Sequence, residues 1–377
     1  MRRRKSDIET KSENKQAVYR FIQMNESATK QEIYTGLGLS LPTIKQSIEF
    51  LEANGVISSS DVIRNTGGRN ATAYRILDSG RFAVGLYLSL NHVIAVCVDL
   101  SGNIIYTKRQ RLGLNAQDDD YLQQIAKLVE ECINNSRLAR SKFLGVGIAV
   151  PSLVSDDGES IIFGMTRNFA GITRTVLAKY IPYPTKLFHD SFVAGFAEVW
   201  KRPKVTNAVY INLNNSIGGS IIINNKLYKG NNHRSGEIGH MLMYPQTGKK
   251  CYCGQVGCFD TVCNAGVLDK HTDGNLQEFF RLVALKDERI LNVWYTYLDN
   301  LAIAVHNLRM LYDCEIILGG HVGSYIENYI EGLWQRVDKL NIFDKPASTY
   351  VLPCKYKNEA TAAGAAIQMI ENFIHAF

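Results

Sequence analysis

The sequence has no long apolar segment and no apolar stretch behind its basic start. Its 377 residues contain no run of about 18 apolar residues, so no membrane-spanning helix is expected. The opening MRRRKSDIET is polar and basic, and it offers no hydrophobic region of a secretory signal. We therefore expect a soluble protein of the cytoplasm.

The chain also lacks a strong excess of either charge. Its 42 Lys and Arg residues stand against 36 Asp and Glu, a net charge of +6, and 46% of its residues are hydrophobic. That apolar content excludes a wholly disordered chain, and the length suits two or three domains. Residues 1–80 hold 12 Lys/Arg against 9 Asp/Glu, which is +3, so the N-terminal part favours an anionic partner.

Cysteine is present eight times, but its pattern does not predict disulfides. Cys251, Cys253 and Cys258 form a C-x-C-x4-C array, with His240 eleven residues upstream. Three Cys and one His match a closed tetrahedral zinc site, and a site with four protein ligands is structural because no open position remains. Ordinary buried cysteines are the alternative, which the Lys, Gln and Gly neighbours disfavour.

Two glycines and two carboxylates surround this array. Gly254 and Gly257 would let the chain turn tightly enough to aim three sulfurs at one point. Glu237 lies three residues before His240, and Asp260 lies two residues after the last cysteine. Carboxylates held near a metal suit the hydroxyls of a small polyol, although they could instead orient the metal ligands.

The first eighty residues predict a winged helix-turn-helix, since capped helices are followed by two short strands around a Gly-rich loop. A small helical interaction module with a polar face is the alternative. The expected elements are a helix over 13–24, a helix after the capping box Thr29–Glu32, a helix with Ser40 as N-cap and Pro42 in its first turn, and strands at 56–57 and 73–77.

Candidate DNA contacts come from the third helix and from the loop between the strands. The loop residues Gly67, Gly68 and Arg69 would bring the backbone and one guanidinium close to DNA. The third helix offers hydroxyl, amide and ammonium groups for base edges and phosphates, from Ser40, Thr43, Lys45, Gln46 and Ser47.

After a linker at 78–81 the pattern changes to strands and helices of a two-lobed body. The expected domains are 1–80 and 81–377, with a first lobe of about 81–200 plus the C-terminal helix and a second of about 201–358. The expected strands are 82–90, 93–100, 104–111, 143–150, 185–188, 208–213, 220–223 and 315–318, and the expected helices are 121–134, 192–200, 291–312 and 360–370.

The motifs G-E-x-G-H at 236–240 and C-x-C-G-x-x-G-C at 251–258 resemble the ROK family (repressor, open reading frame, kinase). The N-terminal reader is similar to that of its repressors of the xylose-repressor and N-acetylglucosamine-repressor type, so the resemblance covers nearly the whole chain. It implies an α/β fold in which a winged helix-turn-helix precedes a two-lobed, actin-like (ribonuclease H-like) sugar-kinase fold.

Both phosphate-binding turns of the family's kinases are altered in this chain. The stretch 87–91 resembles their D-x-G-G-T turn without its carboxylate or glycines, and 214–218 resembles G-T-G-x-G with one glycine left. The pair Gly319-Gly320 remains, but it also serves as a plain turn. We therefore expect no ATP binding and no enzymatic activity. An ATP-dependent sugar kinase with an appended DNA-binding domain stays the alternative.

The resemblance implies that the sugar-contacting groups survive better. It predicts a repressor of carbohydrate-utilisation genes that binds operator DNA as a homodimer or dimer of dimers and senses a sugar between its lobes. Control by a partner protein and loss of sensing remain open. The candidate effector residues are Asn168, His189 (where Asn is usual), Asp190 (the equivalent of the kinase base, expected idle), Glu237, His240 and Asp260 (where Glu is usual).

Overall fold

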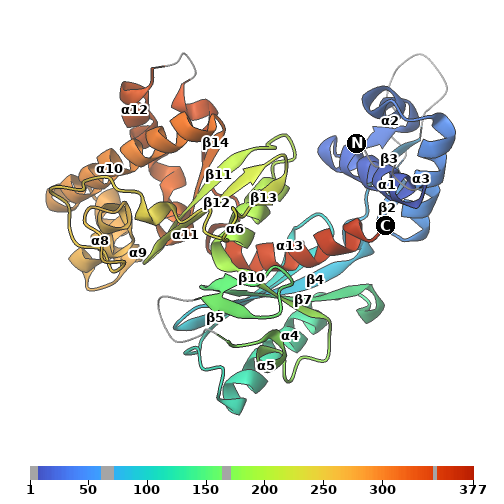
Figure 1. Ribbon diagram of the computed structural model, residues 1–377, viewed down its shortest axis with the longest axis horizontal. Helices are drawn as coiled ribbons and strands as arrows, with labels where there is room; N and C mark the ends of the chain where they lie inside the picture. The colour runs from blue at the N-terminus through green and yellow to red at the C-terminus, as the bar shows by residue number, and fades with distance from the viewer. Residues whose placement is uncertain (1–6, 61–71, 164–170, 343–345) are drawn as a thin grey trace. The chain divides into compact units, whose positions relative to one another are not determined.

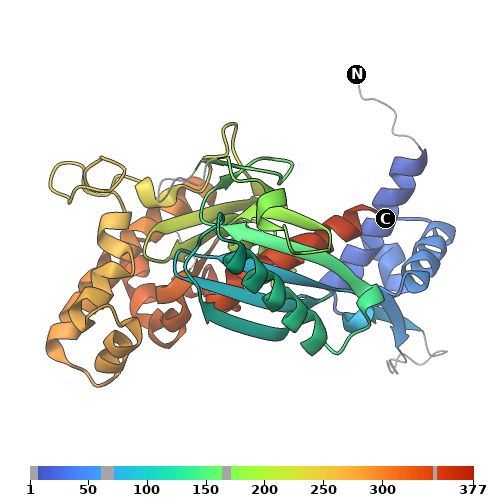
Figure 2. The same cartoon turned by 90° about the horizontal axis from the view of Figure 1, so that it is seen from below.

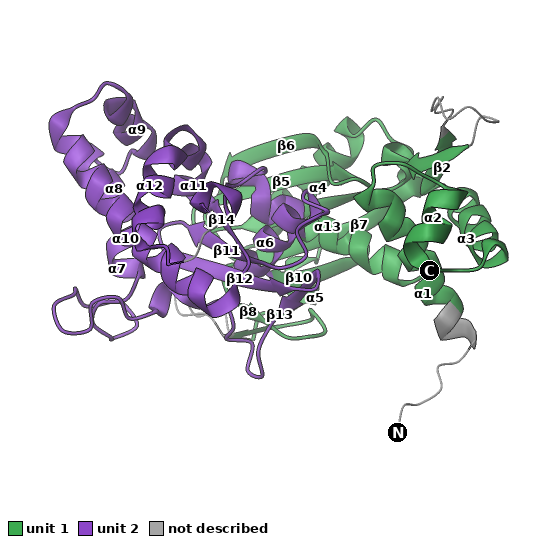
Figure 3. Ribbon diagram, turned by 90° about the horizontal axis from the view of Figure 1, so that it is seen from above, with its two compact units in different colours: residues 1–188, 365–377 green, residues 189–364 purple. Residues whose placement is uncertain are grey.

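The structure is a computed structural model that describes residues 7–60, 72–163, 171–342 and 346–377. It forms two compact units, one of residues 1–188 with 365–377 and one of residues 189–364 (Figure 3). No helix within the described ranges is both long and apolar enough to traverse a bilayer.

The N-terminal part of the first unit is a winged helix-turn-helix, as predicted. Its three-stranded antiparallel sheet has the order β1-β3-β2. The predicted caps are confirmed: the Thr29 hydroxyl accepts a hydrogen bond from the amide of Glu32, whose carboxylate accepts one from the Thr29 amide. Its elements are α1 (Asp7–Met24), β1 (Ala28–Thr29), α2 (Lys30–Leu37), α3 (Leu41–Ala53), β2 (Ile57–Ser60) and β3 (Ala73–Ile76).

Each unit contains a five-stranded sheet of the same connectivity. Both begin with the predicted antiparallel meander, and a later strand then joins the first strand in parallel. Read from the third strand of the meander, the orders are β6-β5-β4-β7-β10 and β13-β12-β11-β14-β15. If the five strands of each sheet are numbered by their order in the chain, both sheets therefore have the spatial order 3-2-1-4-5. This repeated topology is the duplicated, actin-like architecture that the sequence predicted.

The remaining bounds place the helices among these strands. In the first unit they are β4 (Phe82–Leu88), β5 (His92–Asp99), β6 (Ile104–Arg111), α4 (Asp119–Asn135), β7 (Phe143–Val150), β8 (Leu153–Val154), β9 (Ile161–Phe163), α5 (Arg174–Leu177) and β10 (Thr185–His189). From there the chain forms α6 (Asp190–Trp200), β11 (Ala208–Leu213), β12 (Ile217–Ile223), β13 (Lys226–Tyr228), α7 (Asp260–Cys263), α8 (Gly266–Asp269), α9 (Leu276–Ala284), α10 (Glu288–Tyr312), β14 (Glu315–Gly319), α11 (Gly320–Ile326), α12 (Ile330–Leu340), β15 (Val351–Pro353) and α13 (Ala360–His375).

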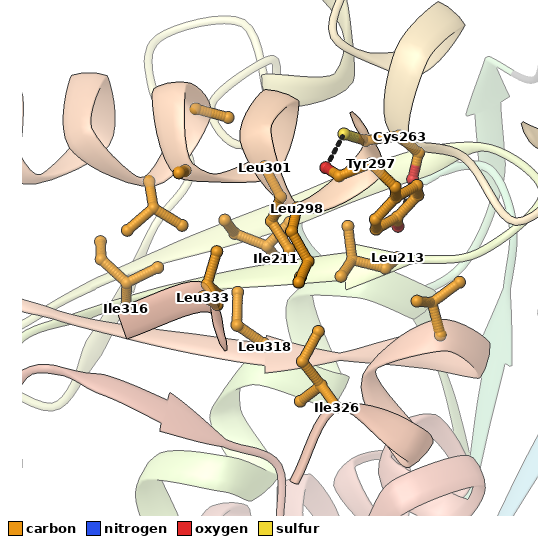
Figure 4. Close-up of a cluster of buried hydrophobic side chains, with 14 of the residues drawn as sticks. Ile211, Leu213, Cys263, Tyr297, Leu298, Leu301, Ile316, Leu318, Ile326 and Leu333 are labelled. Carbon is orange, nitrogen blue, oxygen red and sulfur yellow. Dashed lines mark hydrogen bonds between the residues drawn. The ribbon is translucent and has the colours of Figure 1, made fainter. Parts of the chain in front are cut away.

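The long helix α10 covers the second sheet and completes its core. Its Leu298 and Leu301 are buried beside the β11 residues Ile211 and Leu213 (Figure 4). Burying a leucine side chain contributes about 1.5–3 kcal/mol, so this face is a main source of stability for the second unit. The Tyr297 hydroxyl satisfies its own polarity there by donating to the backbone oxygen of Cys263 at 2.6 Å.

The predicted lobe boundary near residue 200 is wrong for α6. The units separate at 188/189, so α6 belongs to the second unit. The reason lies in the close packing of α6 on the second sheet: a Cβ on Gly195 of α6 would lie only 1.9 Å from the Ser220 hydroxyl of β12. The mostly apolar helix 190–200 does not itself reveal which sheet it will cover.

The C-terminal end of α13 packs against the winged helix-turn-helix within the first unit (Figures 1 and 2). Arg20 of α1 forms an ion pair with Glu371, whose side chain is only 14% exposed. Burial alone would raise the pKa of Glu371, but the hydrogen bond with His375 and the charge of Arg20 hold that pKa below its usual value. The Phe377 ring meets Tyr19 of α1 and Phe50 of α3 edge-on.

We expect Glu371→Gln to lower the free energy of unfolding by about 1–3 kcal/mol, because it removes a largely buried charge-assisted hydrogen bond. Since the pKa of Glu371 is lower in the folded chain, this contribution is complete above the unfolded glutamate pKa of about 4.3 and is lost as pH falls through the folded value. Urea unfolding at pH 7 and at pH 3.5 measures both effects.

The control is Lys179→Met, which breaks the exposed Lys179–Asp119 pair. Exposed pairs contribute about 0–1 kcal/mol, so this variant should unfold almost like the unchanged protein. Equal losses in the two variants would contradict a special role for Glu371.

Candidate metal centre and effector site

The four predicted metal ligands lie together in the second unit. One ligand atom from each of His240, Cys251, Cys253 and Cys258 lies within 4.8 Å of the others. The sulfurs of Cys253 and Cys258 are 3.7 Å apart, and Cys251 Sγ is 3.9 Å from His240 Nδ1. Two sulfurs bound at about 2.3 Å to one tetrahedral ion lie about 3.8 Å apart, so this cluster has the dimensions of a metal site.

Tight backbone turns bring the three cysteines to this point. The Cys251 amide donates to the backbone oxygen of Gln255 at 2.7 Å, and the Gly254 amide donates to that of Cys251 at 3.0 Å. Gly254 and Gly257 both have positive φ, at 94° and 78°. A Cβ on Gly257 would lie 1.9 Å from the backbone oxygen of Tyr244, so only glycine fits there.

His240 presents its two ring nitrogens to different neighbours. Its Nδ1 faces Cys251, whereas its Nε2 lies 3.3 Å from the Tyr252 hydroxyl and 4.0 Å from a carboxylate oxygen of Glu237. The Tyr252 hydroxyl also lies 2.8 Å from Ser216 Oγ. One nitrogen is thus available to a metal while the other belongs to a polar group of Glu237, Tyr252 and Ser216.

Tyr252 is a residue of this site that the sequence analysis missed. Its ring packs edge-on against His240, and the residue is 53% exposed, so only partial desolvation raises the pKa of its hydroxyl above the usual value. The available signal was its position between Cys251 and Cys253, because a residue between two ligands of one ion must lie beside the cluster.

Glu237 and Asp260 have different environments. The Glu237 side chain is 42% exposed and free to meet a ligand. Asp260 is buried at the start of α7, where one carboxylate oxygen accepts from the Ile217 amide at 2.6 Å and the other from the Asn264 side chain at 3.3 Å. Asp260 therefore already ties α7 to the start of β12, and its role toward an effector stays a prediction.

His189 and Asp190 lie at the end of β10 and the beginning of α6. Asp190 is buried and accepts a 2.6 Å hydrogen bond from the Ser191 amide, with His189 Nε2 at 3.6 Å. The other ring nitrogen of His189 is buried and has no partner among the described residues. The Ser191 hydroxyl accepts from the Asn212 side chain at 3.4 Å, which places this pair beside the β11–β12 turn.

The β11–β12 turn, whose sequence resembles the second glycine-rich turn of the kinases, is closed by its own side chains. The Asn214 side-chain oxygen accepts from the His321 amide at the N-terminus of α11 at 2.7 Å, and its amide group donates to Asn212. Gly319 and Gly320 allow this packing, since a Cβ on Gly320 would lie 2.7 Å from the Asn212 side chain. The glycine pair thus has a packing role.

The turn at 87–91 is also satisfied internally. The Ser89 hydroxyl donates to the backbone oxygen of His92 at 2.8 Å and accepts from the His92 amide at 3.2 Å. These bonds close a hairpin between β4 and β5, and residues 87–91 contain none of the glycines that let a backbone approach a polyphosphate closely.

The candidate DNA contacts differ in how exposed they are. Lys45 and Gln46 are exposed on α3, and the hydroxyls of Ser40 and Thr43 lie 2.8 Å apart in the N-cap. The prediction that Ser47 lies on the exposed face is wrong, because its hydroxyl donates to the Thr43 backbone oxygen on the buried side. The wing residues Gly68 and Arg69, and the effector candidate Asn168, lie outside the described residues.

Known proteins are similar to this chain over most of its length. The ROK family model matches residues 84–372. The xylose repressor of Bacillus spizizenii is 23% identical over 381 residues, covering 97% of this chain and 96% of that protein. The N-acetylmannosamine kinase of Vibrio cholerae is 28% identical over 265 residues, covering 66% and 88%. Among solved structures, a ROK family transcriptional regulator, homologous to the E. coli MLC protein, matches with a TM-score of 0.70 at 20% identity, covering 97% of both chains.

We expect the purified protein to contain about one metal ion per chain and Cys253→Ser to lose most of it. An ion present at 100 times its dissociation constant stabilises the fold by about 2.7 kcal/mol, so unfolding should become easier by about that amount. Elemental analysis and urea unfolding on the same samples test this.

Cys314→Ser is the control, since it makes the same chemical change at a cysteine that is buried and stands outside the cluster. Its metal content should equal that of the unchanged protein, whatever happens to its stability. A Cys253→Ser protein with full metal content would contradict the assignment of the ligands.

Proposed function

This chain belongs to the ROK family, and from that premise we propose that it is a cytoplasmic, sugar-responsive repressor of carbohydrate-utilisation genes. The main support is that an N-terminal winged helix-turn-helix precedes a kinase-like body. In that body the two turns that resemble the kinases' phosphate-binding turns, at 87–91 and 214–218, are closed by their own side chains. The similarity to xylose repressors along nearly the whole chain supports the same proposal.

The closed turns argue against phosphoryl transfer. A helix N-terminus attracts phosphate because its amides lack partners, but at α11 the Asn214 oxygen already accepts from the His321 amide. A polyphosphate would have to displace that bond and the neighbouring one between Ser216 and Tyr252. The proposal therefore assigns no catalytic role to Asp190, although the similarity to N-acetylmannosamine kinase keeps a sugar kinase as the second candidate.

Operator DNA is the proposed partner of residues 1–80. In a helix-turn-helix the second helix of the motif enters the major groove, which here is α3 with Lys45 and Gln46 on its exposed face. Arg69 and Gly68 of the predicted wing would contact the backbone or minor groove. A twofold dimer would place two such helices on adjacent half-sites.

Zinc is the proposed occupant of the metal centre. Three thiolates and one imidazole are ligands that zinc prefers, and with all four coordination positions taken by protein the ion would hold the loop and take no part in chemistry. Bound through Nδ1, His240 would keep Nε2 facing Glu237 and Tyr252, which fixes the orientation of both.

A sugar or sugar derivative is the proposed effector. Glu237 and His240 Nε2 offer a carboxylate and an imidazole nitrogen to hydroxyl groups, and the unpartnered nitrogen of His189 beside Asp190 offers a further polar contact. Asn168 and Asp260 complete the proposed set of effector-binding residues. Asp260 would act through its hydrogen bond with the Ile217 amide of β12.

Helix α13 could transmit the effect of a bound sugar to the winged helix-turn-helix of residues 1–80. Its Gly364 packs against α6, the helix that begins at Asp190, so closely that a Cβ would lie 1.9 Å from the Val193 backbone oxygen. About one turn from its other end, Glu371 pairs with Arg20 of the reader. A ligand that binds two states with affinities differing by about 1–3 kcal/mol would suffice to switch them.

Binding to operator fragments should fall steeply as salt is added, because each neutralised phosphate releases counterions. Lys45→Ala should lower the affinity and reduce the magnitude of the salt slope by about one unit. The comparison variant Lys286→Ala removes a lysine of the second unit and should leave both unchanged. Fluorescence anisotropy across a salt series measures these values. An equal loss of DNA affinity in the two variants would contradict the proposal that α3 contacts the operator.

Glu237→Gln should keep operator binding but respond only at about ten- to a hundredfold higher sugar concentration, because a charged acceptor contributes about 1.5–3 kcal/mol. Calorimetry with hexoses, pentoses and their amino and phosphorylated forms identifies the sugar. The matched variant Glu278→Gln, on the exposed face of α9, should respond like the unchanged protein.

Two outcomes would redirect this proposal. Sugar-dependent ADP release that disappears in Asp190→Asn would favour the kinase. Operator binding that no sugar alters at millimolar concentration would favour control by a partner protein or a site that has lost sensing.

A further inference from the structure

The exposed face of α3 is narrower and more apolar than its sequence suggested. Ile44, Ser47, Ile48 and Leu51 are buried on the opposite side. The exposed residues are Leu41, Pro42, Lys45, Gln46 and Glu49. Three of the polar side chains predicted to face DNA are thus absent from this exposed set or engaged in the N-cap, while a leucine stands at the first position of the helix.

Internal contacts divide the exposed face further. Lys45 Nζ lies 3.7 Å from a carboxylate oxygen of Glu49, one turn along the helix. The Ser40 hydroxyl accepts from the Thr43 amide at 3.3 Å and lies 2.8 Å from the Thr43 hydroxyl. The apolar Leu41 is 50% exposed, and the Gln46 side chain forms no hydrogen bond with other described residues. These two side chains are free to contact a ligand without first breaking a bond.

The position of Leu41 matches a particular base. Residues at the N-terminal end of a recognition helix contact base edges in the major groove, and apolar side chains there contact the C5-methyl group of thymine. We infer that Leu41 is a specificity-determining residue that reads one thymine methyl in each operator half-site. This inference rests on the proposed DNA-binding function and adds a base preference to it.

The spacing to Gln46 gives the inference a second constraint. Five residues correspond to about 7.5 Å along an α-helix, and successive bases of one strand are about 3.4 Å apart. Glutamine pairs bidentately with adenine N6 and N7. Five residues also place the two side chains about 140° apart around the helix axis. The thymine read by Leu41 and an adenine read by Gln46 should therefore be separate positions of the same half-site.

The experiment begins with a random double-stranded DNA pool, from which the full-length protein selects its preferred sequence. Each thymine of that sequence is then replaced singly by uracil, which removes only the methyl group. Burying one methyl-sized group contributes about 0.8 kcal/mol, or roughly fourfold in affinity. One replacement per half-site should weaken binding by about fourfold, and Leu41→Ala should be insensitive to that same replacement.

Two variants serve as controls. Leu41→Met keeps an apolar contact and should retain the sensitivity to uracil, whereas Leu285→Ala truncates a leucine that is 64% exposed in the second unit and should behave like the unchanged protein. Thermal melting verifies that Leu41→Ala remains folded, as its exposure leads us to expect.

The outcomes separate the inference from the function on which it rests. An equal uracil penalty in the unchanged protein and in Leu41→Ala overturns the role of Leu41 while leaving DNA binding intact. Selection of a sequence in which no thymine methyl matters also overturns it. Failure of the unchanged protein to enrich any sequence overturns the proposed reader itself.

Discussion

The convergence of His240 with three cysteines is the constraint on which the candidate site depends. Between residues 242 and 256 only Cys251 is buried, and Met243 packs in part against the core of the second unit, so the hydrophobic effect holds this segment only weakly. Backbone turns, the 2.8 Å hydrogen bond between the Tyr244 hydroxyl and Asn300, and whatever joins the four ligands supply the rest of its order. The same segment carries Tyr252 and leads directly into Phe259 and Asp260, which are buried in the second unit. The convergence turns Nδ1 of His240 toward Cys251 and so leaves its second nitrogen facing the Tyr252 hydroxyl.

A second constraint follows from the β11–β12 turn. Several of its polar side chains pair with protein: Asn214 with His321 and Asn212, and Ser216 with Tyr252. A glycine-rich turn would instead leave amides open to a phosphate. In this chain the side chains of the turn instead link the sheet to the segment that carries Cys251 and Cys253, because Tyr252 reaches Ser216 only where a side chain exists to receive it.

Much of this could be predicted because local chemistry decides it. The caps at Thr29 and Ser40, the two strand meanders and the cluster of His240 with the cysteines each follow from spacing and residue type. The errors arise where tertiary packing decides. Ser47 was misplaced because a polar residue can still lie on the buried side of α3 when its hydroxyl bonds to the turn before it. The assignment of α6 to a sheet depends on the close approach of Gly195 to β12, which no periodicity reveals.

The sugar-driven switch that we propose requires only modest energies. A typical intramolecular hydrogen bond contributes about 0.5–1.5 kcal/mol net, and bonds to charged groups about 1.5–3. The contacts of His240 Nε2 at 3.3 and 4.0 Å are loose, and Glu237 is partly exposed, so a ligand hydroxyl can replace them without opening the core. The free energy gained or lost when two or three such hydrogen bonds are exchanged is similar to a typical coupling free energy of about 1–3 kcal/mol. The Arg20–Glu371 pair at the far end of α13 belongs to the same range. A small polar ligand could therefore bias the reader by shifting bonds of comparable strength, with the hydrophobic cores of both units left unchanged.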